Sequence, residues 1–327
     1  MPKKDIPRVQ HYVPQFILKH FTDGKKPQVW VYDKSEGRKF RSNVSNVAAE
    51  SGFYDFEFKG AELSLEPALS SLESDASRVI KQIIKQESLA DFSREEKALL
   101  SSFIAVQFVR TKQNRMMSKA VVCDLEERIR QMGFEPERIK GFAKFNEQEE
   151  KMLSVMCVQR ANEYVPHFME KDWVLLKGSK RNPLLISDNP ITLQNHNDFS
   201  PYGNIGLSVK GIQIHFPISK ELSLGLYCPS IGDQVREGYE KYLRLAKLEP
   251  TLAAGLIKDP LGLAQLAAGF NSGRAVPLKP ENVLNLNSLQ VRFSERFLFS
   301  SINDFTLPEL MITEHPEYKL GPRMHIS

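Results

Sequence analysis

The sequence predicts an α+β protein. We expect a helical middle of three to four long helices packed on a small mixed or antiparallel sheet, with a C-terminal helix that returns to the core. Apolar residues from Leu65 to Ile83 recur every three or four positions, which indicates an amphipathic helix. Residues 212–218 and 222–227 are apolar runs joined by a three-residue polar turn, a pattern typical of an antiparallel hairpin. Helices and strands therefore occupy separate stretches of the chain.

The other elements follow from start, stop and pattern signals. Ser93 and Glu96 have the spacing of a capping box, so a long helix is expected to begin there and to run to about Arg130. A further helix is expected over residues 147–168, where Pro166 bends or ends it. Six more elements are expected: strands at residues 28–32, 53–58, 173–176 and 184–186, and helices at residues 234–248 and 281–300.

Composition limits the class of protein. Hydrophobic residues make up 41% and charged residues 26% of the 327 residues, which is enough to bury a large core without disulfide bonds. The 44 basic and 40 acidic residues leave a net charge of +4, too small for the footprint of a dedicated DNA-binding domain. Cys123, Cys157 and Cys228 form no C-x-x-C pair, so neither a structural zinc site nor a disulfide framework is expected.

No segment has the pattern of a secretion signal or of a membrane span. The lysines near the N-terminus are not followed by the apolar region of a signal peptide. The longest apolar stretch, residues 252–270, is interrupted by Lys258, Asp259 and Pro260, whereas a span needs roughly 20 nearly uninterrupted apolar residues. We therefore expect a cytoplasmic protein without a membrane partner.

Several signatures of catalysis are missing from the sequence. There is no phosphate-binding loop ending in Gly-Lys-Ser/Thr, no G-x-G-x-x-G after a strand, no H-E-x-x-H and no G-x-S-x-G. Nucleoside-triphosphate hydrolysis, dehydrogenation and serine-hydrolase chemistry are thereby disfavoured. The seven histidines also show no metal-ligand spacing.

The first candidate motif runs from Gln10 to Gln15. Pro14 in this motif has a fixed φ and forces the residue before it into an extended conformation, so the chain turns and then starts a helix. His11 and Gln15 are expected near that start. A neutral imidazole there can act as a general base, a metal ligand or a hydrogen-bonding strut, and a purely structural histidine is the alternative.

The second candidate motif runs from Asn46 to Glu50 and is followed by Phe53 and Tyr54. Asn46 is expected to cap a single helical turn, which Glu50 would end. Both side chains are candidates for contact with a ligand. The alternative is a capping turn with a solvated glutamate.

The third candidate motif lies on the helix that begins after Ser93. Apolar side chains surround its axis, but Gln107 and Arg110 share one face. A buried arginine destabilises the fold unless a negative partner lies opposite. Glu66 and Glu73 on the preceding helix are the internal candidates for this partner, and a bound anion such as phosphate is the alternative.

The fourth candidate motif follows the predicted strand at residues 184–186. Pro190 keeps Asn189 extended, so Asp188 is held at the carboxyl end of a strand, where α/β proteins commonly place ligand and metal residues. A carboxylate there can hold a divalent metal such as Mg²⁺ or act as a base, and an Asx turn is the alternative. Asp188 is the best single catalytic candidate, with Asn189 as a ligand contact.

Together the four motifs resemble a microbial family of domains of unknown function that is marked by a His-Tyr-Val-Pro motif, found here at residues 11–14. The segments that carry the resemblance are residues 11–21, 30–33, 46–54, 107–110 and 187–190, with Asn287 and Gln290 near the end. The resemblance implies one integrated domain at residues 5–302, with a helix-rich part (60–171), a strand-rich part (172–228) and a helical part (234–302). An irregular tail would follow at residues 303–327. The resemblance implies no particular substrate or cofactor.

Two functions are compatible with the motifs. In the first, the protein is a metal-assisted hydrolase of nucleic acid or of a nucleotide, in which Asp188 and either Glu66 or Glu73 hold the metal. Arg110 would then meet the phosphate charge, and His11 would transfer protons. In the second, the same polar residues form a buried network that fixes the fold of a non-catalytic ligand-binding or protein-interaction protein.

Overall fold

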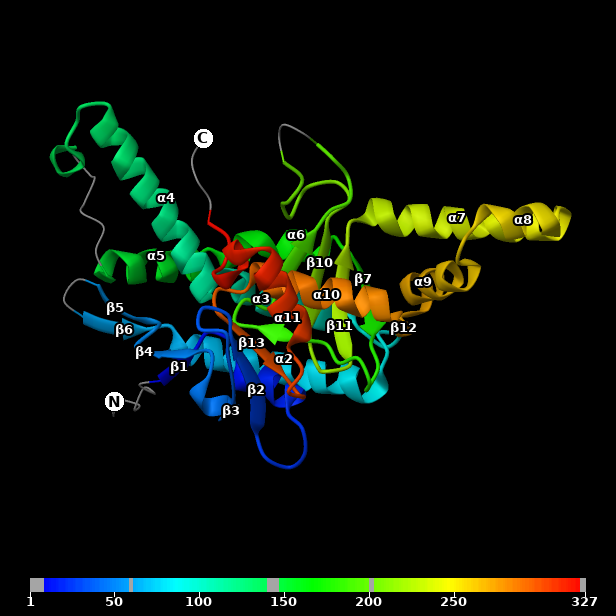
Figure 1. Ribbon diagram of the computed structural model, residues 1–327, viewed down its shortest axis with the longest axis horizontal. Coiled ribbons are helices and arrows are strands. Elements are labelled where there is room, and N and C mark those ends of the chain that lie inside the picture. The colour runs from blue at the N-terminus through cyan, green and yellow to red at the C-terminus, as the bar shows by residue number, and fades with distance from the viewer. Residues whose placement is uncertain (1–8, 59–60, 140–146, 200–202, 324–327) are drawn as a thin grey trace.

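The computed structural model describes residues 9–58, 61–139, 147–199 and 203–323 (Figure 1). Its centre is a five-stranded sheet in the order β12-β7-β11-β10-β9. These strands are Val276–Pro277, Asp172–Lys177, Leu222–Tyr227, Gln213–Pro217 and Thr192–Gln194. Neighbouring strands are antiparallel, except that β12 is parallel to β7. The predicted α+β class and mixed sheet are confirmed.

The hairpin of β10 and β11 is also confirmed, with Phe216 opposite Leu224. Successive residues of a strand point to opposite faces, and the packing of β7 follows this rule. Leu175 joins the large core on one face, whereas Val174 and Leu176 join a second apolar cluster on the other. Both faces of the central sheet are therefore buried.

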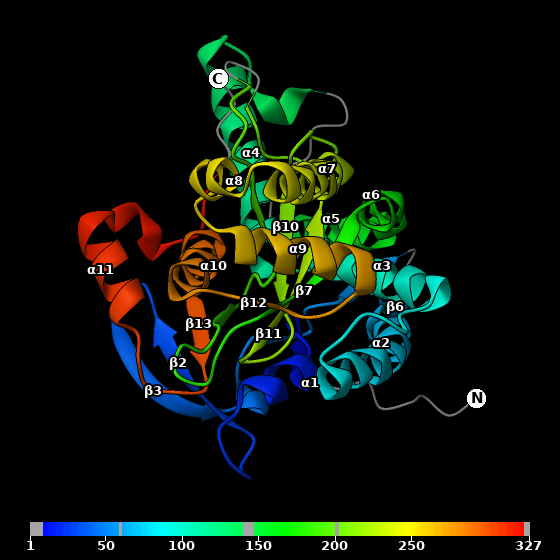
Figure 2. The ribbon, with the colours of Figure 1, turned by 90° about the vertical axis from the view of Figure 1, so that its right-hand side faces the viewer.

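Helices cover the two faces of the central sheet. The face that contains Leu175 packs against α2 (Glu66–Gln86) and α3 (Arg94–Val109), with Phe103 of α3 at 6.2 Å from Phe216 between ring centroids. The opposite face is crossed by α9 (Pro260–Ser272) and α10 (Pro280–Phe293), as Figure 2 shows. The amphipathic helix predicted from the spacing of Leu65 to Ile83 is α2, and α10 is the C-terminal helix that returns to the core.

A second, four-stranded antiparallel sheet has the order β3-β2-β13-β8. Its strands are Arg38–Asn43, Gln28–Asp33, Phe297–Ser300 and Ile186–Ser187. On one face Tyr32 and Leu298 pack with Val291 of α10 and Ile312 of α11 (Thr306–Glu314). On the other face Phe299 belongs to the large core.

The remaining elements complete the chain. The short strands are β1 (Val9–His11), β4 (Ala49–Ser51), β5 (Asp55–Phe58) and β6 (Ala61–Ser64). The other helices are α1 (Gln15–Leu18), α4 (Lys112–Gln131), α5 (Glu147–Gln159), α6 (Val165–Met169), α7 (Pro229–Leu248) and α8 (Pro250–Leu256). Short 3₁₀ turns are η1 (Lys19–Phe21), η2 (Val44–Asn46), η3 (Pro136–Arg138), η4 (Ala161–Tyr164) and η5 (Pro316–Lys319).

The structure differs from the sequence predictions in several places. The helix expected over residues 147–168 is divided into α5 (Glu147–Gln159), the turn η4 (Ala161–Tyr164) and α6 (Val165–Met169). The helix expected to run to Arg130 divides at Arg110, because the Thr111 side chain accepts the N–H of Asn114 and starts α4 as a new helix. The helix expected at residues 281–300 ends at Phe293, because the segment after it pairs with β2 and β8. The tail expected to be irregular contains α11, and the Asp304 carboxylate accepts the N–H of Thr306, the first residue of this helix.

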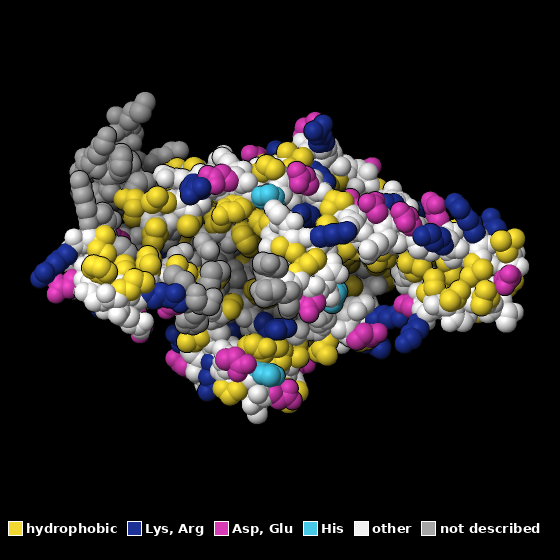
Figure 3. Space-filling model, turned by 90° about the horizontal axis from the view of Figure 1, so that it is seen from above, with side chains coloured by type: hydrophobic (Ala, Val, Ile, Leu, Met, Phe, Trp, Pro, Cys, Tyr) yellow, Lys and Arg dark blue, Asp and Glu magenta, His cyan; other side chains and the backbone are white. Residues whose placement is uncertain are grey.

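The helices α7 and α8 extend away from the central sheet, opposite the end from which α4 projects (Figure 1). Seen from above, hydrophobic side chains gather at the end of the molecule formed by these helices (Figure 3). Leu248, Leu252, Leu256 and Leu261 are exposed in this region. Among the described residues, no helix combines the length and apolar character that a membrane crossing requires.

The predicted capping box at the start of α3 is confirmed. The Ser93 hydroxyl accepts the N–H of Glu96 at 3.1 Å, and the Glu96 carboxylate accepts the N–H of Ser93 at 2.9 Å. We expect Ser93→Ala to lower the free energy of unfolding by about 1 kcal/mol in urea denaturation, because one helix N–H loses its acceptor. The matched variant Ser70→Ala, on the exposed face of α2, should change it by less than about 0.5 kcal/mol. Equal effects of the two substitutions would contradict this prediction.

Candidate functional site

The first two motifs lie side by side because β1 and β4 pair, with His11 opposite Ala49. Ala48 has a φ of 52°, a left-handed conformation that residues with a Cβ seldom adopt. Its carbonyl oxygen accepts the N–H groups of Tyr12, at 2.9 Å, and of Val13, at 3.4 Å. The strained turn of the second motif thus holds the first motif in place.

The third motif reaches the same place from α3. Gln107 donates from Nε2 to the carbonyl oxygen of Tyr12 at 2.9 Å and accepts at Oε1 from Nε of Arg110 at 2.8 Å. Nη1 of Arg110 donates to Oε1 of Glu73 at 2.6 Å. The Arg110 side chain is 1% exposed and that of Glu73 is 26% exposed. The buried guanidinium therefore has an acidic partner on α2, as its burial requires.

Two buried nitrogen atoms at this place have no hydrogen-bond partner in the described part of the chain, Nη2 of Arg110 and Nε2 of His11. Burial lowers the pKa of His11, while the Ser45 backbone and the charge of Glu73 act in the opposite direction. The imidazole is therefore neutral at pH 7. A buried polar atom without a partner costs roughly 1–3 kcal/mol, so both nitrogens are positioned to gain from a ligand or from water.

Glu66, the first residue of α2, adds a further carboxylate on the same helix as Glu73. Its pKa is raised, first by burial and then by the charge of Glu73, whereas Arg110 acts in the opposite direction and Asp55 adds to the rise. Arg110 can neutralise one of these carboxylates, so negative charge is in excess. We call the five residues His11, Glu66, Glu73, Gln107 and Arg110 the motif cluster.

The structure adds residues to this place that the sequence reasoning missed. Gln10 is fully buried, donates from Nε2 to Asp55 at 2.6 Å and accepts the N–H of Tyr54 at 2.5 Å. The hydroxyl of Tyr54 donates to the carbonyl oxygen of His11 at 3.2 Å. Gln10 and Tyr54 were quoted as parts of the motifs, but nothing in their spacing indicated that they would meet.

Other predicted residues lie elsewhere. Asn43, and not Asn46, caps the turn η2, because Asn43 accepts the N–H of Ser45 while Asn46 is the last residue of that turn. Gln15 starts α1 and makes no side-chain hydrogen bond within the described residues. Glu50 forms ion pairs with Lys112, at 2.6 Å, and with Arg115, at 3.3 Å. The predicted ligand contacts of these three residues stay predictions.

Asp188 occupies the strand exit that the sequence predicts, but it is 0% exposed. Its Oδ1 accepts the N–H of Glu295, and its Oδ2 accepts the N–H groups of Arg296 and Phe297, all at 2.8 Å. Burial raises its pKa to about 6, while these N–H groups and the charge of Lys34 act in the opposite direction. Asp188 thus joins β8 to the segment between α10 and β13, and its hydrogen bonds share no partner with those of Arg110.

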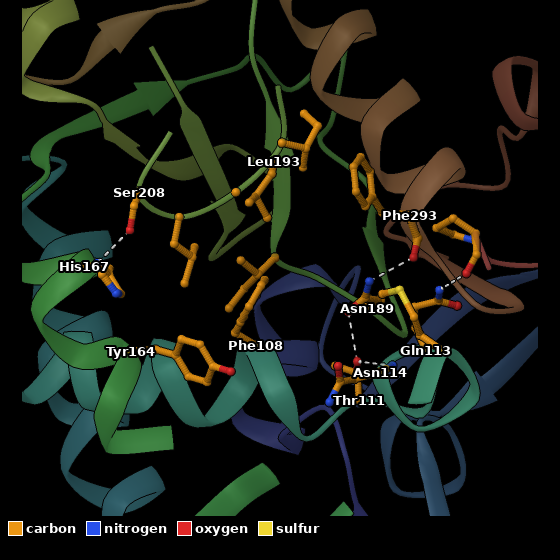
Figure 4. Close-up of a pocket in the computed structure, with 16 residues that line it drawn as sticks. Phe108, Thr111, Gln113, Asn114, Tyr164, His167, Asn189, Leu193, Ser208 and Phe293 are labelled. Atoms are coloured by element: carbon orange, nitrogen blue, oxygen red, sulfur yellow. Dashed lines mark hydrogen bonds between the residues drawn. The ribbon is translucent and has the colours of Figure 1, made fainter. Parts of the chain in front are cut away.

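Asn189 belongs to the wall of a cavity of about 430 Å³ (Figure 4). It accepts at Oδ1 from the Thr111 hydroxyl at 3.0 Å and donates from Nδ2 to the carbonyl oxygen of Phe293 at 2.9 Å. Most of the wall is apolar, with Phe108, Met117, Tyr164, Ile191, Leu193 and Leu207. Arg110 and Thr111 are adjacent in the chain, so one helix junction supplies both the motif cluster and this cavity.

The structure therefore brings together the predicted residues of the motif cluster and places Asp188 and Asn189 in other hydrogen-bond networks. Within the described part of the chain, no group of three or more His, Cys, Asp and Glu side chains is arranged to hold a metal ion. A metal at Asp188 would displace three backbone N–H groups. Glu66 and Asp55 lie near enough for the charge of Asp55 to raise the pKa of Glu66, after burial and the charge of Glu73.

Comparison with known proteins gives one match. A family model described as a protein of unknown function (DUF4238) matches residues 9–304. No curated protein and no solved structure matches the chain. The matched segment contains the motif cluster, Asp188 and both sheets.

Proposed function

The chain belongs to the DUF4238 family of proteins of unknown function, and from the motif cluster we propose that it is a hydrolase that cleaves a phosphate ester of a nucleotide or of nucleic acid with the help of a divalent metal. One observation carries the proposal. Arg110 and His11 each keep a buried nitrogen without a partner, beside carboxylates that outnumber the cations. Such a site gains from a cation and from an anion bound together.

The excess of negative charge supports the cation. Burial first, and then the charge of Glu73, raises the pKa of Glu66, and Glu73 is itself already paired with Arg110, so a cation beside Glu66 would stabilise its ionised form. Mg²⁺ commonly takes only one or two protein carboxylates and fills its other positions with water and substrate phosphate. Glu66 and Asp55 would hold it in this way, where it would polarise the phosphate.

The unpartnered nitrogens support the anion. Nη2 of Arg110 carries N–H groups without an acceptor, and a phosphate oxygen is a strong acceptor for a guanidinium. The partial exposure of Glu73 gives this side of the cluster contact with solvent. A preorganised guanidinium would also stabilise the charge that develops on the phosphate during cleavage.

His11 is suited to move the proton. The imidazole is neutral, so its free Nε2 can accept the proton of a water molecule whose oxygen attacks phosphorus. The bond between phosphorus and the leaving oxygen then breaks, and that oxygen takes up a proton from solvent.

A second candidate function is binding without catalysis, and a separate observation favours it. Asp188 is fully engaged by backbone N–H groups, and the cavity beside Asn189 is largely apolar, as small-molecule binding sites commonly are. In this case the motif cluster would fix the fold, and its substitution would change stability but no turnover.

The two candidates differ in an assay of the purified protein with Mg²⁺ or Mn²⁺. Substrates are nucleoside monophosphates, bis(p-nitrophenyl) phosphate and single-stranded oligonucleotides. We expect His11→Gln and Glu66→Gln each to lower kcat by about 100-fold or more, because the first removes the proton-transfer group and the second removes a proposed metal ligand. Their melting temperatures should stay close to that of the wild type.

The matched controls are His315→Gln and Glu163→Gln, which alter the same residue types in exposed ion pairs. Both should keep full activity. A folded wild-type protein that cleaves none of these substrates with either metal contradicts the hydrolase. So does a His11→Gln variant with unchanged kcat.

A further inference from the structure

A second cavity, of about 390 Å³, is lined by residues of the central sheet and of the helices α9 and α10. None of its lining residues belongs to the motif cluster. Its apolar surface comes from the sheet and from both helices: Leu176, Val276, Leu263, Leu266 and Leu286. The cavity is of the size that encloses small molecules, which occupy roughly 300–1,000 Å³.

Side-chain amides form an ordered chain along one wall of this cavity. Asn285 donates from Nδ2 to Oε1 of Gln194 at 3.0 Å. Nε2 of Gln194 then donates to Oε1 of Gln213 at 3.0 Å and lies 3.1 Å from Nε2 of His215. All the polar atoms of the Gln194 side chain are thus used, which fixes the orientation of its amide.

The same series of hydrogen-bonded amides also determines which ring nitrogen of His215 carries the proton. Burial, with a smaller effect of His196, lowers the pKa of His215 to about 3, so the imidazole is neutral. Since Nε2 accepts from Gln194, the single ring proton is on Nδ1. His215 is 2% exposed, and its Nδ1 has no partner in the described part of the chain.

A second unpartnered group stands beside it. Tyr227 is on β11, next to β10, and its ring makes an edge contact with His215 at 5.6 Å between centroids. Burial alone raises the pKa of Tyr227 well above its usual value, and its hydroxyl makes no hydrogen bond to a described residue. Buried polar groups are normally paired, so the unpartnered Nδ1 of His215, next to the Tyr227 hydroxyl in the wall of one cavity, indicates a missing partner.

The charge of the cavity limits what that partner is. Asp259 and Lys279 are the charged residues of the lining, and they bind each other at 2.6 Å. Neither is left to bind a charged ligand. The free hydrogen-bonding atoms are donors on His215 and Gln213, the Tyr227 hydroxyl, and the acceptor Oδ1 of Asn285.

We propose that this cavity is a binding site for an uncharged nucleobase or nucleoside. Asparagine and glutamine amides pair with the mixed donor and acceptor edges of bases, and the leucines and the Tyr227 ring offer apolar surface to the faces of the base. The site is independent of the proposed hydrolase, because it shares no residue with the motif cluster and needs no metal.

Isothermal titration calorimetry of the full chain with adenosine, guanosine, cytidine and uridine, and with the free bases, tests this site. We expect saturable binding of at least one of these compounds in the presence of a metal chelator. Tyr227→Phe should weaken it about fivefold to tenfold, and His215→Phe by about tenfold or more, because each removes a hydrogen bond. Without ligand, Tyr227→Phe should melt no lower than the wild type, since the lost hydroxyl has no partner.

The control variant Tyr164→Phe, in the cavity beside Asn189, should bind with unchanged affinity. The variant His11→Gln should also bind normally, which separates this site from the proposed active site. The proposal is overturned if no nucleoside or base binds, if glucose binds in their place, or if folded Tyr227→Phe and His215→Phe bind as tightly as the wild type.

Discussion

Replacing Arg110 by alanine is expected to lower the free energy of unfolding by about 3–5 kcal/mol, because one partner of a buried ion pair is removed. Three interactions disappear together: the hydrogen bond to Gln107, the ion pair with Glu73 and the contact with the Phe103 ring. Urea denaturation measures the loss, with the m value (the dependence of the free energy of unfolding on urea concentration) held equal for the two proteins.

The variant Glu73→Gln should cost less than Arg110→Ala. Glu73 is partly exposed, so water offsets part of the lost interaction, and the glutamine oxygen can still accept from Arg110. A matched surface variant is Arg160→Ala, which breaks an exposed ion pair with Glu163. If Arg110→Ala is as stable as Arg160→Ala, the guanidinium does not support the fold, and its place in the motif cluster serves a ligand alone.

The second large effect is expected for Asp188→Ala, which should lower the free energy of unfolding by about 4 kcal/mol or more. Three buried N–H groups lose their acceptor, at roughly 1–3 kcal/mol each. Lys34 also loses the negative charge of Asp188, which favours its charged form. Burial already lowers the pKa of Lys34 to about 8, and without Asp188 this pKa should fall further.

Hydrogen exchange locates this effect in the chain. The amides of Glu295, Arg296 and Phe297 should lose protection in Asp188→Ala, and Asp188→Asn should be intermediate because one acceptor oxygen remains. Asp304→Ala is the matched control, since Asp304 is exposed and also caps a backbone N–H. Unchanged protection of the three amides would show that Asp188 does not hold this segment.

Arg110 and Asp188, the two strongest candidates from the sequence, have different roles in the structure. Arg110 and Asp188 were expected to face one pocket, but each has its own set of partners. The motif cluster keeps two unpartnered nitrogens, whereas both carboxylate oxygens of Asp188 have hydrogen-bond partners. A ligand is therefore expected at the first place, and a stabilising role is expected for Asp188.

Much of the fold was determined by local sequence signals. The spacing of Leu65 to Ile83 predicts α2, the pair Ser93 and Glu96 predicts the start of α3, and the short polar turn predicts the hairpin of β10 and β11. Each of these signals acts over a few residues, where side-chain spacing and capping decide the backbone. The acidic partner of Arg110 was also predicted from local sequence, because the apolar residues around Arg110 on its helix indicated that it is buried.

Only the tertiary structure decided which distant groups meet. Phe297–Ser300 becomes the strand β13 because it pairs with β2, more than 260 residues earlier in the chain, although its own sequence also fits the end of a helix. Asp188 receives its N–H groups from residues more than 100 positions away. Hydrogen bonds between segments so far apart depend on how the layers pack, and no spacing within either segment encodes them.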